Sequence, residues 1–421
     1  MAAPVPRQLY HTGSTGDAPS FFLLIRAEYH RIIIKNKSIR KYCCKGRITM
    51  AVVYGKDTPK LGFGLMRLPR KAVATDVEQV KTMVDLFMEA GFTYFDTAYV
   101  YEGSEAAFKK AVVDRIPRDR YTIADKLPAW ALNNGRSPED IFNESLRRVG
   151  VDYFDYYLMH NVNEDSAPVF DKYDAWSFVN RMVAEGKIKH LGFSCHGKPP
   201  LLEKVLSEHP EVEFGQLQIN FMDWTDEYVR ANEMYAIVRK HGKSVTVMEP
   251  IKGGTLALIR QEAKDKLAAL GEGGSVASYA LRWVGSHEGI KTILSGMNSI
   301  EQMDENTKTF TDFKPLNEAE QKAMDECREE LLAVPTVPCT ACRYCCEGCP
   351  MHINIPGMMK IYNALLLYGD HPGAHFMYGR EQEDGSGKLC DCLKCGQCES
   401  VCPQHIKIPE ILEKASAFLD K

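Results

Sequence analysis

The stretch Cys339-Thr-Ala-Cys342-Arg-Tyr-Cys345-Cys-Glu-Gly-Cys349-Pro350 determines how the end of this chain folds. Its spacing, Cys-x2-Cys-x2-Cys-x3-Cys-Pro, occurs a second time, at Cys392, Cys395, Cys398, Cys402 and Pro403. With this spacing, three thiolates of one run bind one [4Fe-4S] cluster and the fourth thiolate reaches a second cluster. The sequence therefore predicts two [4Fe-4S] clusters held by these eight cysteines.

The residues that follow the two runs are also alike, which makes this region an internal repeat. Cys-Pro-Met-His-Ile-Asn-Ile-Pro starts at Cys349, and Cys-Pro-Gln-His-Ile-Lys-Ile-Pro starts at Cys402. Helical spacing over residues 356–368 and 409–419 predicts a helix after each run. We therefore expect residues 316–421 to form a small, mostly helical ferredoxin-like domain, joined to the preceding domain at residues 312–315.

Zinc is the main alternative to iron–sulfur clusters. Paired Cys-x2-Cys motifs bind zinc, but a zinc site closes with four ligands and does not use a third cysteine at this spacing. A disulfide framework is disfavoured because the close-set cysteines follow a long, ordinary enzyme-like sequence. Cys346 and Cys390 lie beside the runs, where each is either a spare thiol or a substitute ligand.

Composition limits the class of protein. The chain has 421 residues, a formal net charge of −4 and 45% hydrophobic residues, enough for one large domain and one small one. No basic excess suggests a nucleic-acid partner, and no run of about eighteen apolar residues suggests a membrane span. We expect a cytoplasmic protein in an oxygen-poor cell.

The first 49 residues do not resemble the rest of the chain. Met50 opens a stretch that reads as a natural enzyme start, and the basic residues before it show no clear periodicity. We interpret residues 1–49 as a non-native extension from a mis-set start codon, or as a disordered tail.

From about Lys60 the sequence alternates between strand-like and helix-like segments. The predicted strands are 61–68, 93–97, 121–126, 154–160, 190–194, 215–220, 245–249 and 291–294. The predicted helices are 75–90, 138–149, 169–185, 227–240 and 275–286. Eight strands separated by helices or crossovers predict a closed (β/α)8 barrel over residues 50–315. The absence of a Gly-x-Gly-x-x-Gly turn also disfavours an open dinucleotide-binding sheet.

Ionisable side chains occur where three successive predicted strands end. Asp96, Lys126 and His160 close these strands, and Tyr101 follows Asp96 in the next loop. Chemistry in a barrel collects at the carboxyl ends of the strands. Each residue also has a structural explanation, since an Asp caps helices, a Lys is often solvated and a His is often hydrogen-bonded in a core.

Together these residues resemble the catalytic set of the aldo-keto reductase superfamily, which uses Asp, Tyr, Lys and His. The resemblance covers residues 58–310, in family order, and includes Asp96-Thr97-Ala98-x-x-Tyr101, Asp125-Lys126-Leu127, Leu158-Met159-His160, Gly192-Phe193-Ser194 and Gln216-x-x-x-Asn220. With the cysteine runs, the chain is similar to the branch of the superfamily that carries a two-cluster domain, found mainly in anaerobic bacteria and archaea.

The resemblance implies reduction of an aldehyde or ketone to an alcohol with NADPH or NADH. Tyr101 would donate the proton, Lys126 would lower the pKa of Tyr101, and Asp96 would keep Lys126 charged. His160 would orient the carbonyl group and donate a hydrogen bond to its oxygen. The residues do not identify the substrate.

Further residues match the family's cofactor site. By resemblance, Ser194 and Gln216 would bind the nicotinamide carboxamide with Asn220 on the same strand, and Glu305 and Asn306 belong to the adenosine stretch. Met248 stands where many relatives stack a tyrosine on the ring, and a Met can also pack on a ring. Gly296 and Gln302 replace the family's phosphate-reading cations, so the choice between NADPH and NADH stays open. Asn306 is equally compatible with a helix-end role.

The large aromatic residues Tyr99, Trp130 and Trp224 either shape the mouth of the barrel or pack in its loops.

The role of the clusters is also open, because clusters move single electrons and a hydride carries two. Three interpretations remain: structural or oxygen-sensing clusters in a carbonyl reductase, clusters that exchange electrons with an external ferredoxin, and a non-catalytic redox-sensing module. The complete Asp-Tyr-Lys-His set disfavours the third.

Overall fold

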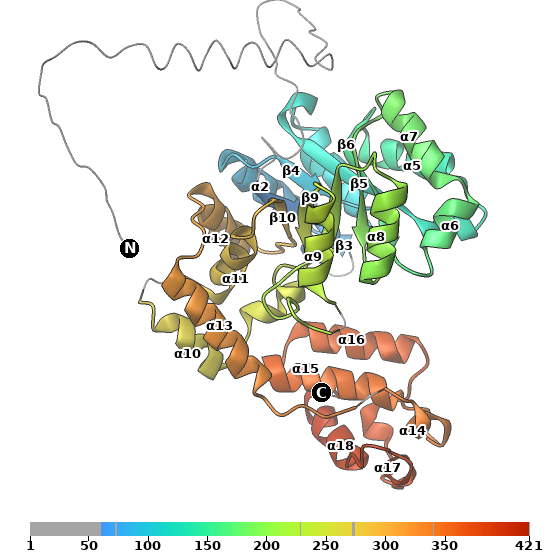
Figure 1. The fold of residues 1–421 in the computed structure, drawn as a ribbon, viewed down its shortest axis with the longest axis vertical. Coiled ribbons are helices and arrows are strands. Elements are labelled where there is room, and N and C mark those ends of the chain that lie inside the picture. The colour runs from blue at the N-terminus through green and yellow to red at the C-terminus, as the bar shows by residue number, and fades with distance from the viewer. Residues whose placement is uncertain (1–59, 72–73, 228, 272–273, 340, 421) are drawn as a thin grey trace, which may run out of the picture. The chain divides into compact units, whose positions relative to one another are not determined.

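Parallel strands close into a barrel in the computed structural model, which describes residues 60–420 except 72–73, 228, 272–273 and 340 (Figure 1). The prediction for residues 1–49 lies outside the described residues. Within them, the eight strands of the barrel pair in the order β1-β10-β9-β8-β7-β6-β5-β4 and back to β1. They are β1 (Leu61–Gly64), β4 (Tyr94–Asp96), β5 (Thr122–Pro128), β6 (Phe154–Val162), β7 (Ile188–Cys195), β8 (Phe214–Gln218), β9 (Ser244–Met248) and β10 (Ile290–Ser295). The predicted (β/α)8 barrel is confirmed.

The strands are rich in β-branched and aromatic residues and are buried on both faces, as parallel strands require. A separate cluster of buried side chains comes from alternate positions of the strands and fills the barrel interior. It consists of Tyr94, Ala124, Tyr156, Leu158, Phe214 and Leu294. A Cβ at Gly192 would lie 2.5 Å from the Phe214 ring, so this tight packing requires glycine there.

Helices cover the outside of the barrel. They include α2 (Val77–Glu89), α3 (Ser104–Phe108), α5 (Pro138–Val149), α6 (Ala167–Lys172), α7 (Ala175–Ala184), α8 (Pro199–Glu208), α9 (Ala231–Lys240), α11 (Val276–Gly285) and α12 (Ile300–Thr311). The predicted helix over 169–185 is two helices, because Asp174 has a φ of 49° that interrupts the helix. None of the helices in the described ranges combines the length and apolar character of a membrane span.

Local sequence signals set both ends of helix α5. Ser137 and Asp140 form a capping box, and Pro138 occupies the first turn. Gly150 ends the helix with a φ of 80°, a conformation that glycine adopts without strain. The predicted bounds, 138–149, are those observed.

Helix α13 (Glu318–Leu332) packs with the barrel, although the sequence assigned it to the C-terminal domain. Its side chains Met324, Cys327 and Leu331 are part of the barrel's hydrophobic core. Arg282 of α11 also pairs with Glu320 of α13 at 2.6 Å, with both side chains mostly buried. We infer that the boundary between the two domains follows α13 and does not fall at residue 315.

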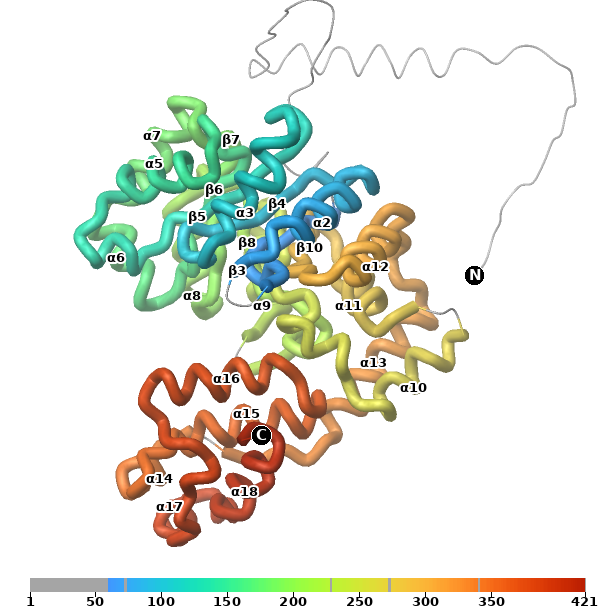
Figure 2. Tube along the Cα trace, turned by 180° about the vertical axis from the view of Figure 1, so that it is seen from behind, coloured from blue at the N-terminus to red at the C-terminus, as the bar shows by residue number. Residues whose placement is uncertain are grey.

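The helices that follow α13 gather into one group (Figures 1 and 2). They are α14 (Tyr344–Glu347), α15 (Ile355–Tyr368), α16 (Pro372–Glu383), α17 (Gln397–Ser400) and α18 (Ile408–Leu419). Ile353, Met358, Leu389 and Leu412 are buried in their shared core. The helices predicted after the two cysteine runs are α15 and α18, and the domain is mostly helical, as predicted.

The backbone of the two cysteine runs repeats as their sequence does. Three positions in or just after each run have the left-handed conformation, which residues other than glycine seldom adopt. The matching pairs, with their φ angles, are Ala341 (55°) and Lys394 (52°), Arg343 (67°) and Gly396 (76°), and His352 (53°) and His405 (52°). The internal repeat is therefore present in the backbone conformation as well as in the sequence.

Candidate active site and cluster site

The four residues of the predicted catalytic set come together at the carboxyl ends of three neighbouring strands. Asp96 ends β4, Lys126 lies in β5 and His160 lies in β6. Tyr101 lies in the loop between β4 and α3, residues 97–103, which we call the Tyr101 loop. Parallel pairing of these strands brings their carboxyl ends side by side.

Lys126 and Asp96 form a buried ion pair. The Nζ of Lys126 donates to Oδ1 of Asp96 at 2.6 Å and to the carbonyl oxygen of Thr97 at 2.5 Å, and the Lys126 side chain is fully buried. Burial lowers the pKa of Lys126, but attraction to Asp96 and Tyr101 outweighs it and leaves this pKa above its ordinary value. Lys126 is therefore a fixed cation in a dry setting, where its field is strong.

Tyr101 lies over this cation. The Nζ of Lys126 is 5.0 Å from the centroid of the Tyr101 ring. Burial raises the pKa of Tyr101 above its ordinary value, and Lys126 lowers the pKa by less than burial raises it. The predicted effect of Lys126 is present, but the predicted net lowering is wrong, because desolvation disfavours the phenolate more strongly. Tyr101 is therefore a protonated phenol at neutral pH.

His160 faces Tyr101 across the same end of the barrel. The two rings are 5.9 Å apart in an edge-to-face arrangement, and the half-exposed Trp130 ring lies 5.4 Å from His160. Burial and the nearby Lys126 hold the pKa of His160 well below its ordinary value, so the imidazole is neutral. Among the described residues, its Nδ1 has no hydrogen-bond partner. A neutral ring beside a protonated phenol can direct hydrogen bonds to one substrate oxygen.

A second buried acidic group lies behind Lys126, and sequence reasoning missed it. Asp125 is fully buried, and burial together with the neighbouring Glu105 carboxyl raises the pKa of Asp125 well above its ordinary value. Glu105 is also buried and accepts a hydrogen bond from Arg148 at 3.1 Å. Asp125 was quoted only as the neighbour of Lys126 in a matched motif, and nothing in the sequence indicated that Glu105 lies beside it.

Two of the predicted cofactor residues present suitable polar atoms. Ser194 in β7 is buried and accepts a hydrogen bond from the Asn161 backbone at 2.8 Å, which leaves its hydroxyl hydrogen to donate. Gln216 in β8 lies beside Met248, with its Nε2 3.7 Å from the sulfur. In the described part of the chain, Oε1 of Gln216 is buried without a partner. An unpaired acceptor near a hydroxyl donor fits a carboxamide such as that of nicotinamide.

Asn220 is placed differently. Its amide donates to Asp223 at 2.8 Å and to the carbonyl oxygen of Glu249 at 3.1 Å, and its Oδ1 accepts from the backbone of Met222 and Asp223. These bonds use its polar atoms within the protein. Asn220 therefore holds the chain where β8 ends against β9.

The predicted adenosine stretch spans the end of β10 and helix α12. Asn306 is buried and donates to Oγ of Ser295 at 3.0 Å, whereas Glu305 is partly exposed. Gln302, which stands in place of a phosphate-reading cation, accepts from the Asn298 backbone at 2.9 Å. This hydrogen bond at the start of α12 uses the side-chain oxygen of Gln302.

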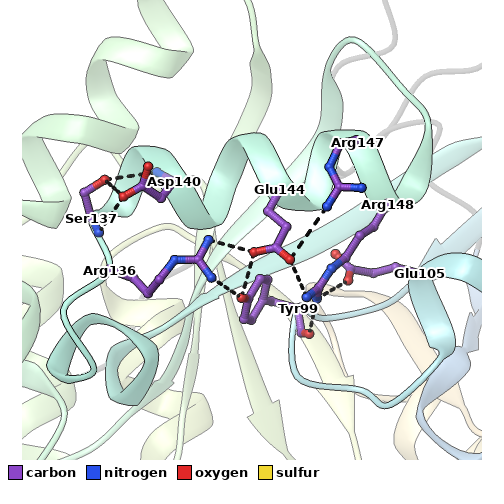
Figure 3. Close-up of polar contacts among 8 residues, drawn as sticks. All are labelled: Tyr99, Glu105, Arg136, Ser137, Asp140, Glu144, Arg147 and Arg148. Atoms are coloured by element: carbon purple, nitrogen blue, oxygen red, sulfur yellow. Dashed lines mark hydrogen bonds and ion pairs between the residues drawn. The ribbon is translucent and has the colours of Figure 1, made fainter.

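Two of the three aromatic residues considered for the mouth have other surroundings. The Tyr99 hydroxyl points toward α5, where it donates to Glu144 at 3.0 Å (Figure 3). Trp224 packs against Trp283 and His287, at ring distances of 5.5 and 4.6 Å. Only Trp130 of the three contacts a residue of the candidate catalytic set among the described residues.

The cysteines line two small cavities in the C-terminal domain. The first cavity is lined by Cys339, Cys342 and Cys345 of the first run together with Cys402 of the second run. The second is lined by Cys392, Cys395 and Cys398 of the second run together with Cys349 of the first. Each cavity thus has three thiols from one run and the fourth from the other, which is the ligand set of a two-cluster protein.

These cavities fit clusters better than single ions. In the described ranges, no three His, Cys, Asp or Glu side chains are arranged to hold one metal ion. Four thiols around an apolar space instead suit a cubane of iron and sulfur, whose ligands stand farther apart than those of zinc. Neither Cys346 nor Cys390 lines either cavity.

Comparisons with known proteins agree with both halves of this description. The aldo/keto reductase family matches residues 60–329, and the 4Fe-4S dicluster domain matches residues 338–406. A 9,11-endoperoxide prostaglandin H2 reductase from Trypanosoma cruzi is 26% identical over 276 residues, covering 65% of this chain and 88% of that protein. Methylglyoxal reductase DkgA from Salmonella typhimurium is 28% identical over 242 residues, covering 54% and 76%.

Solved structures show the same fold. An aldo-keto reductase from Klebsiella pneumoniae, in complex with NADPH, aligns with a TM-score of 0.51 at 23% identity and covers 64% of this chain and 90% of that chain. The resemblance predicted from the strand-end residues and the cysteine runs is confirmed. The chain belongs to the aldo/keto reductase family and carries a 4Fe-4S dicluster domain.

Proposed function

We propose that this protein reduces an aldehyde or ketone to an alcohol with NADPH or NADH. The observation that carries the proposal is the Tyr101 ring, placed over the buried Lys126–Asp96 pair and edge-on to His160. Reduction of a carbonyl group requires a proton at its oxygen, and this arrangement supports proton donation. The reductases among its relatives support the same class of reaction.

Each side chain of the set has a separate task in this proposal. Tyr101 donates its proton to the substrate oxygen, and the Lys126 ammonium stabilises the phenolate that remains. Asp96 keeps Lys126 charged and fixed by a 2.6 Å hydrogen bond. His160 donates a second hydrogen bond that orients the carbonyl group. In the reverse reaction the Tyr101 phenolate accepts the proton.

The cofactor would bind along the ends of β7 to β10. Ser194 and Gln216 would hold the carboxamide, Met248 would pack against the ring, and Glu305 and Asn306 would contact the adenosine portion. Asn220 would keep the β8 end in place for them. When bound, the reduced nicotinamide supplies the hydride. The NADPH complex of the Klebsiella pneumoniae structure supports a nicotinamide cofactor, and both NADPH and NADH should be tested.

The deciding experiment uses the full chain with its clusters, prepared without oxygen. We expect NADPH or NADH oxidation that depends on an added aldehyde, and we expect Tyr101→Phe to lower kcat by about 10²- to 10⁴-fold while cofactor binding is kept. Steady-state rates and cofactor fluorescence titration measure the two quantities. Near-normal turnover by the Tyr101→Phe variant would disprove the role of Tyr101.

A second candidate function is electron exchange between the clusters and a partner protein such as a ferredoxin. Cys342 and Cys395 are exposed, and the exposed side chains Tyr344 and Leu393 adjoin them, so both cavities have an edge that a partner could approach. Cluster absorbance recorded with the nicotinamide signal separates the two functions. Bleaching of the clusters before any carbonyl is added would favour this candidate. We place the protein in the cytoplasm, whose reducing setting keeps cysteines out of disulfides.

A further inference from the structure

Three charged side chains hold the outer side of the Tyr101 loop. Two of them lie in helix α5 and the third lies just before it. Arg136, Glu144 and Arg148 form a connected set of hydrogen bonds and ion pairs, which we call the α5 clamp (Figure 3). Its contacts across to the barrel are with Tyr99, two residues before Tyr101, and Glu105, four residues after it. The clamp therefore contacts the chain on both sides of the proposed acid.

The hydroxyl of Tyr99 is fixed by two members of the clamp. It donates to Oε2 of Glu144 at 3.0 Å and accepts from Nη1 of Arg136 at 3.0 Å. Arg136 in turn donates to the same Glu144 oxygen at 2.7 Å. This closed triangle of hydrogen bonds fixes the Tyr99 hydroxyl beside α5 (Figure 3).

Arg148 connects the two sides of the Tyr101 loop. One nitrogen of its guanidinium donates to the carbonyl oxygen of Tyr99 at 3.4 Å and to Oε2 of Glu105 at 3.1 Å. The other nitrogen pairs with Glu144 at 2.5 Å, and the group lies 4.6 Å from the centroid of the Tyr99 ring. A planar guanidinium can make all these contacts at once, whereas an ammonium cannot.

Burial and charge balance make this arrangement stronger than a surface salt bridge. The Glu105 side chain is 4% exposed, Glu144 is 20% exposed and Arg148 is 35% exposed. The close contacts pair two cations, Arg136 and Arg148, with the carboxylates of Glu105 and Glu144. A hydrogen bond from Arg136 also holds the pKa of Glu144 below its ordinary value, which keeps this carboxylate ionised.

The inner side of the same loop is tied to the catalytic set. Lys126 donates to the carbonyl oxygen of Thr97, and the hydroxyls of Thr97 and Ser104 are 2.7 Å apart. The Tyr101 loop is thus held between Lys126 on one side and the α5 clamp on the other. A shift of about 1 Å in a reacting group can lower a rate by about 100-fold, so both attachments bear on the rate.

We propose that Arg148 is a positioning residue, which sets the location of Tyr101 relative to Lys126 by holding Tyr99 and Glu105 at once. The inference rests on the proposed function, since it concerns the placement of the proposed acid. Arg148 does not touch the reacting atoms in this account. It acts through the backbone on both sides of Tyr101.

The test compares two neighbouring arginines in the full chain with its clusters. Arg148→Met removes the contacts with Tyr99, Glu105 and Glu144. Arg147→Met is the matched control, because Arg147 is 75% exposed and reaches Glu144 only at 3.8 Å. We expect Arg148→Met to lower kcat by about 10- to 100-fold with KM for the carbonyl changed by less than about threefold. Arg148→Lys should recover part of the rate, and Arg147→Met should behave as the parent protein.

Hydrogen–deuterium exchange supplies a readout that does not depend on turnover. We expect faster exchange in peptides covering residues 97–105 of the Arg148→Met protein, with the peptides of β6 to β9 unchanged, and no change in the Arg147→Met protein. Unchanged exchange in 97–105 would overturn the proposal. Faster exchange over the whole barrel would also overturn it, because Arg148 would then contribute to global stability.

The two hypotheses fail in different ways. If the parent protein and Tyr101→Phe show the same rate, the proposed function fails, and the exchange experiment alone decides whether Arg148 holds the loop. If Tyr101→Phe is inactive but Arg148→Met has the kcat of the parent protein, the proposed function stands and the positioning role is wrong.

Discussion

The barrel and the cysteine domain build their sites in opposite ways. In the barrel, Lys126 and Asp96 pair with each other, and the strands that carry them are fixed by neighbouring strands. In the cysteine domain, four thiols surround each of two cavities, and a small helical core lies beside them. The ion pair of the first site is complete within the protein, whereas the second site needs a bound group at its centre.

This difference determines what each site needs for its folding. Lys126 and Asp96 hold each other in place, so this part of the barrel site can be arranged before any ligand binds, whereas Nδ1 of His160 and Oε1 of Gln216 have no partner among the described residues. In a small domain with metal-binding thiolates, the free energy of metal binding is part of the free energy of folding. The two halves of the molecule should therefore respond differently to loss of their ligands.

The largest expected effect is loss of one cluster from a single cysteine change. Cys402→Ala removes the fourth thiol of the first cavity, and Cys349→Ala removes the fourth thiol of the second. We expect each variant to lose about half of its iron and sulfide, because each cluster needs its complete ligand set. Iron analysis and electron paramagnetic resonance of the reduced protein measure the loss.

The barrel should be unaffected by these cysteine changes. All four tryptophans, Trp130, Trp176, Trp224 and Trp283, lie in the barrel, so their fluorescence reports its unfolding alone. Cys390→Ala is the matched control, since Cys390 is exposed and lines neither cavity. Loss of iron from the control, or a barrel that unfolds together with the cluster domain, would contradict the comparison.

A smaller effect is expected from breaking the buried ion pair. Lys126→Met leaves the Asp96 carboxylate buried without its partner, which should lower the free energy of unfolding of the barrel by about 3–5 kcal/mol. The double variant Asp96→Asn/Lys126→Met should recover most of this loss without recovering activity. Urea unfolding followed by tryptophan fluorescence measures both.

The ion-pair experiment also separates stability from catalysis. Iron content should stay at the parental level in both variants, since the pair lies in the barrel. Equal stability of the parent and Lys126→Met proteins would show that water reaches Asp96, contrary to its 3% exposure.

The smallest effect concerns pH. Burial holds the pKa of His160 well below its ordinary value in the folded protein, whereas unfolding restores a pKa of about 6.5. Below about pH 6.5 the unfolded state therefore binds a proton that the folded state does not, and stability is lost as pH falls, by at most about 1.4 kcal/mol per pH unit. His160→Asn should remove this part of the slope. Parallel slopes for the parent and the variant between pH 5 and 6.5 would contradict a neutral, buried His160.

The features that could be predicted from sequence are those with a local signal. The eight strands carry short, mostly buried runs rich in apolar residues, the cysteine runs carry a fixed spacing, and the residues of the catalytic set stand at or just after strand ends. Helix 169–185 was predicted as one element because its apolar periodicity continues across Asp174, where only the backbone angle shows the break. Helices α8, α12, α13 and α16 are not among the predicted helices.

What could not be predicted depends on contacts between distant parts of the chain. Arg148 and Tyr99 are 49 positions apart in the sequence, and nothing in either local sequence indicates that they meet. The same holds for α13, whose amphipathic pattern shows that it packs but not on which domain. Burial of Tyr101 outweighs the expected effect of Lys126 on its pKa, and burial is a property of the assembled barrel.

The exchange of the fourth cysteine between the two runs has a consequence for biosynthesis. The first cavity is complete only when Cys402 is present, and the second only when Cys349 is present. During translation the barrel segment leaves the ribosome first and can begin to fold as a unit, while the thiols of the first run remain without their full ligand set. Cluster insertion must then wait until the second run has been synthesised, so the exposed thiols of the nascent chain face a period of vulnerability to oxidation that the barrel site does not share.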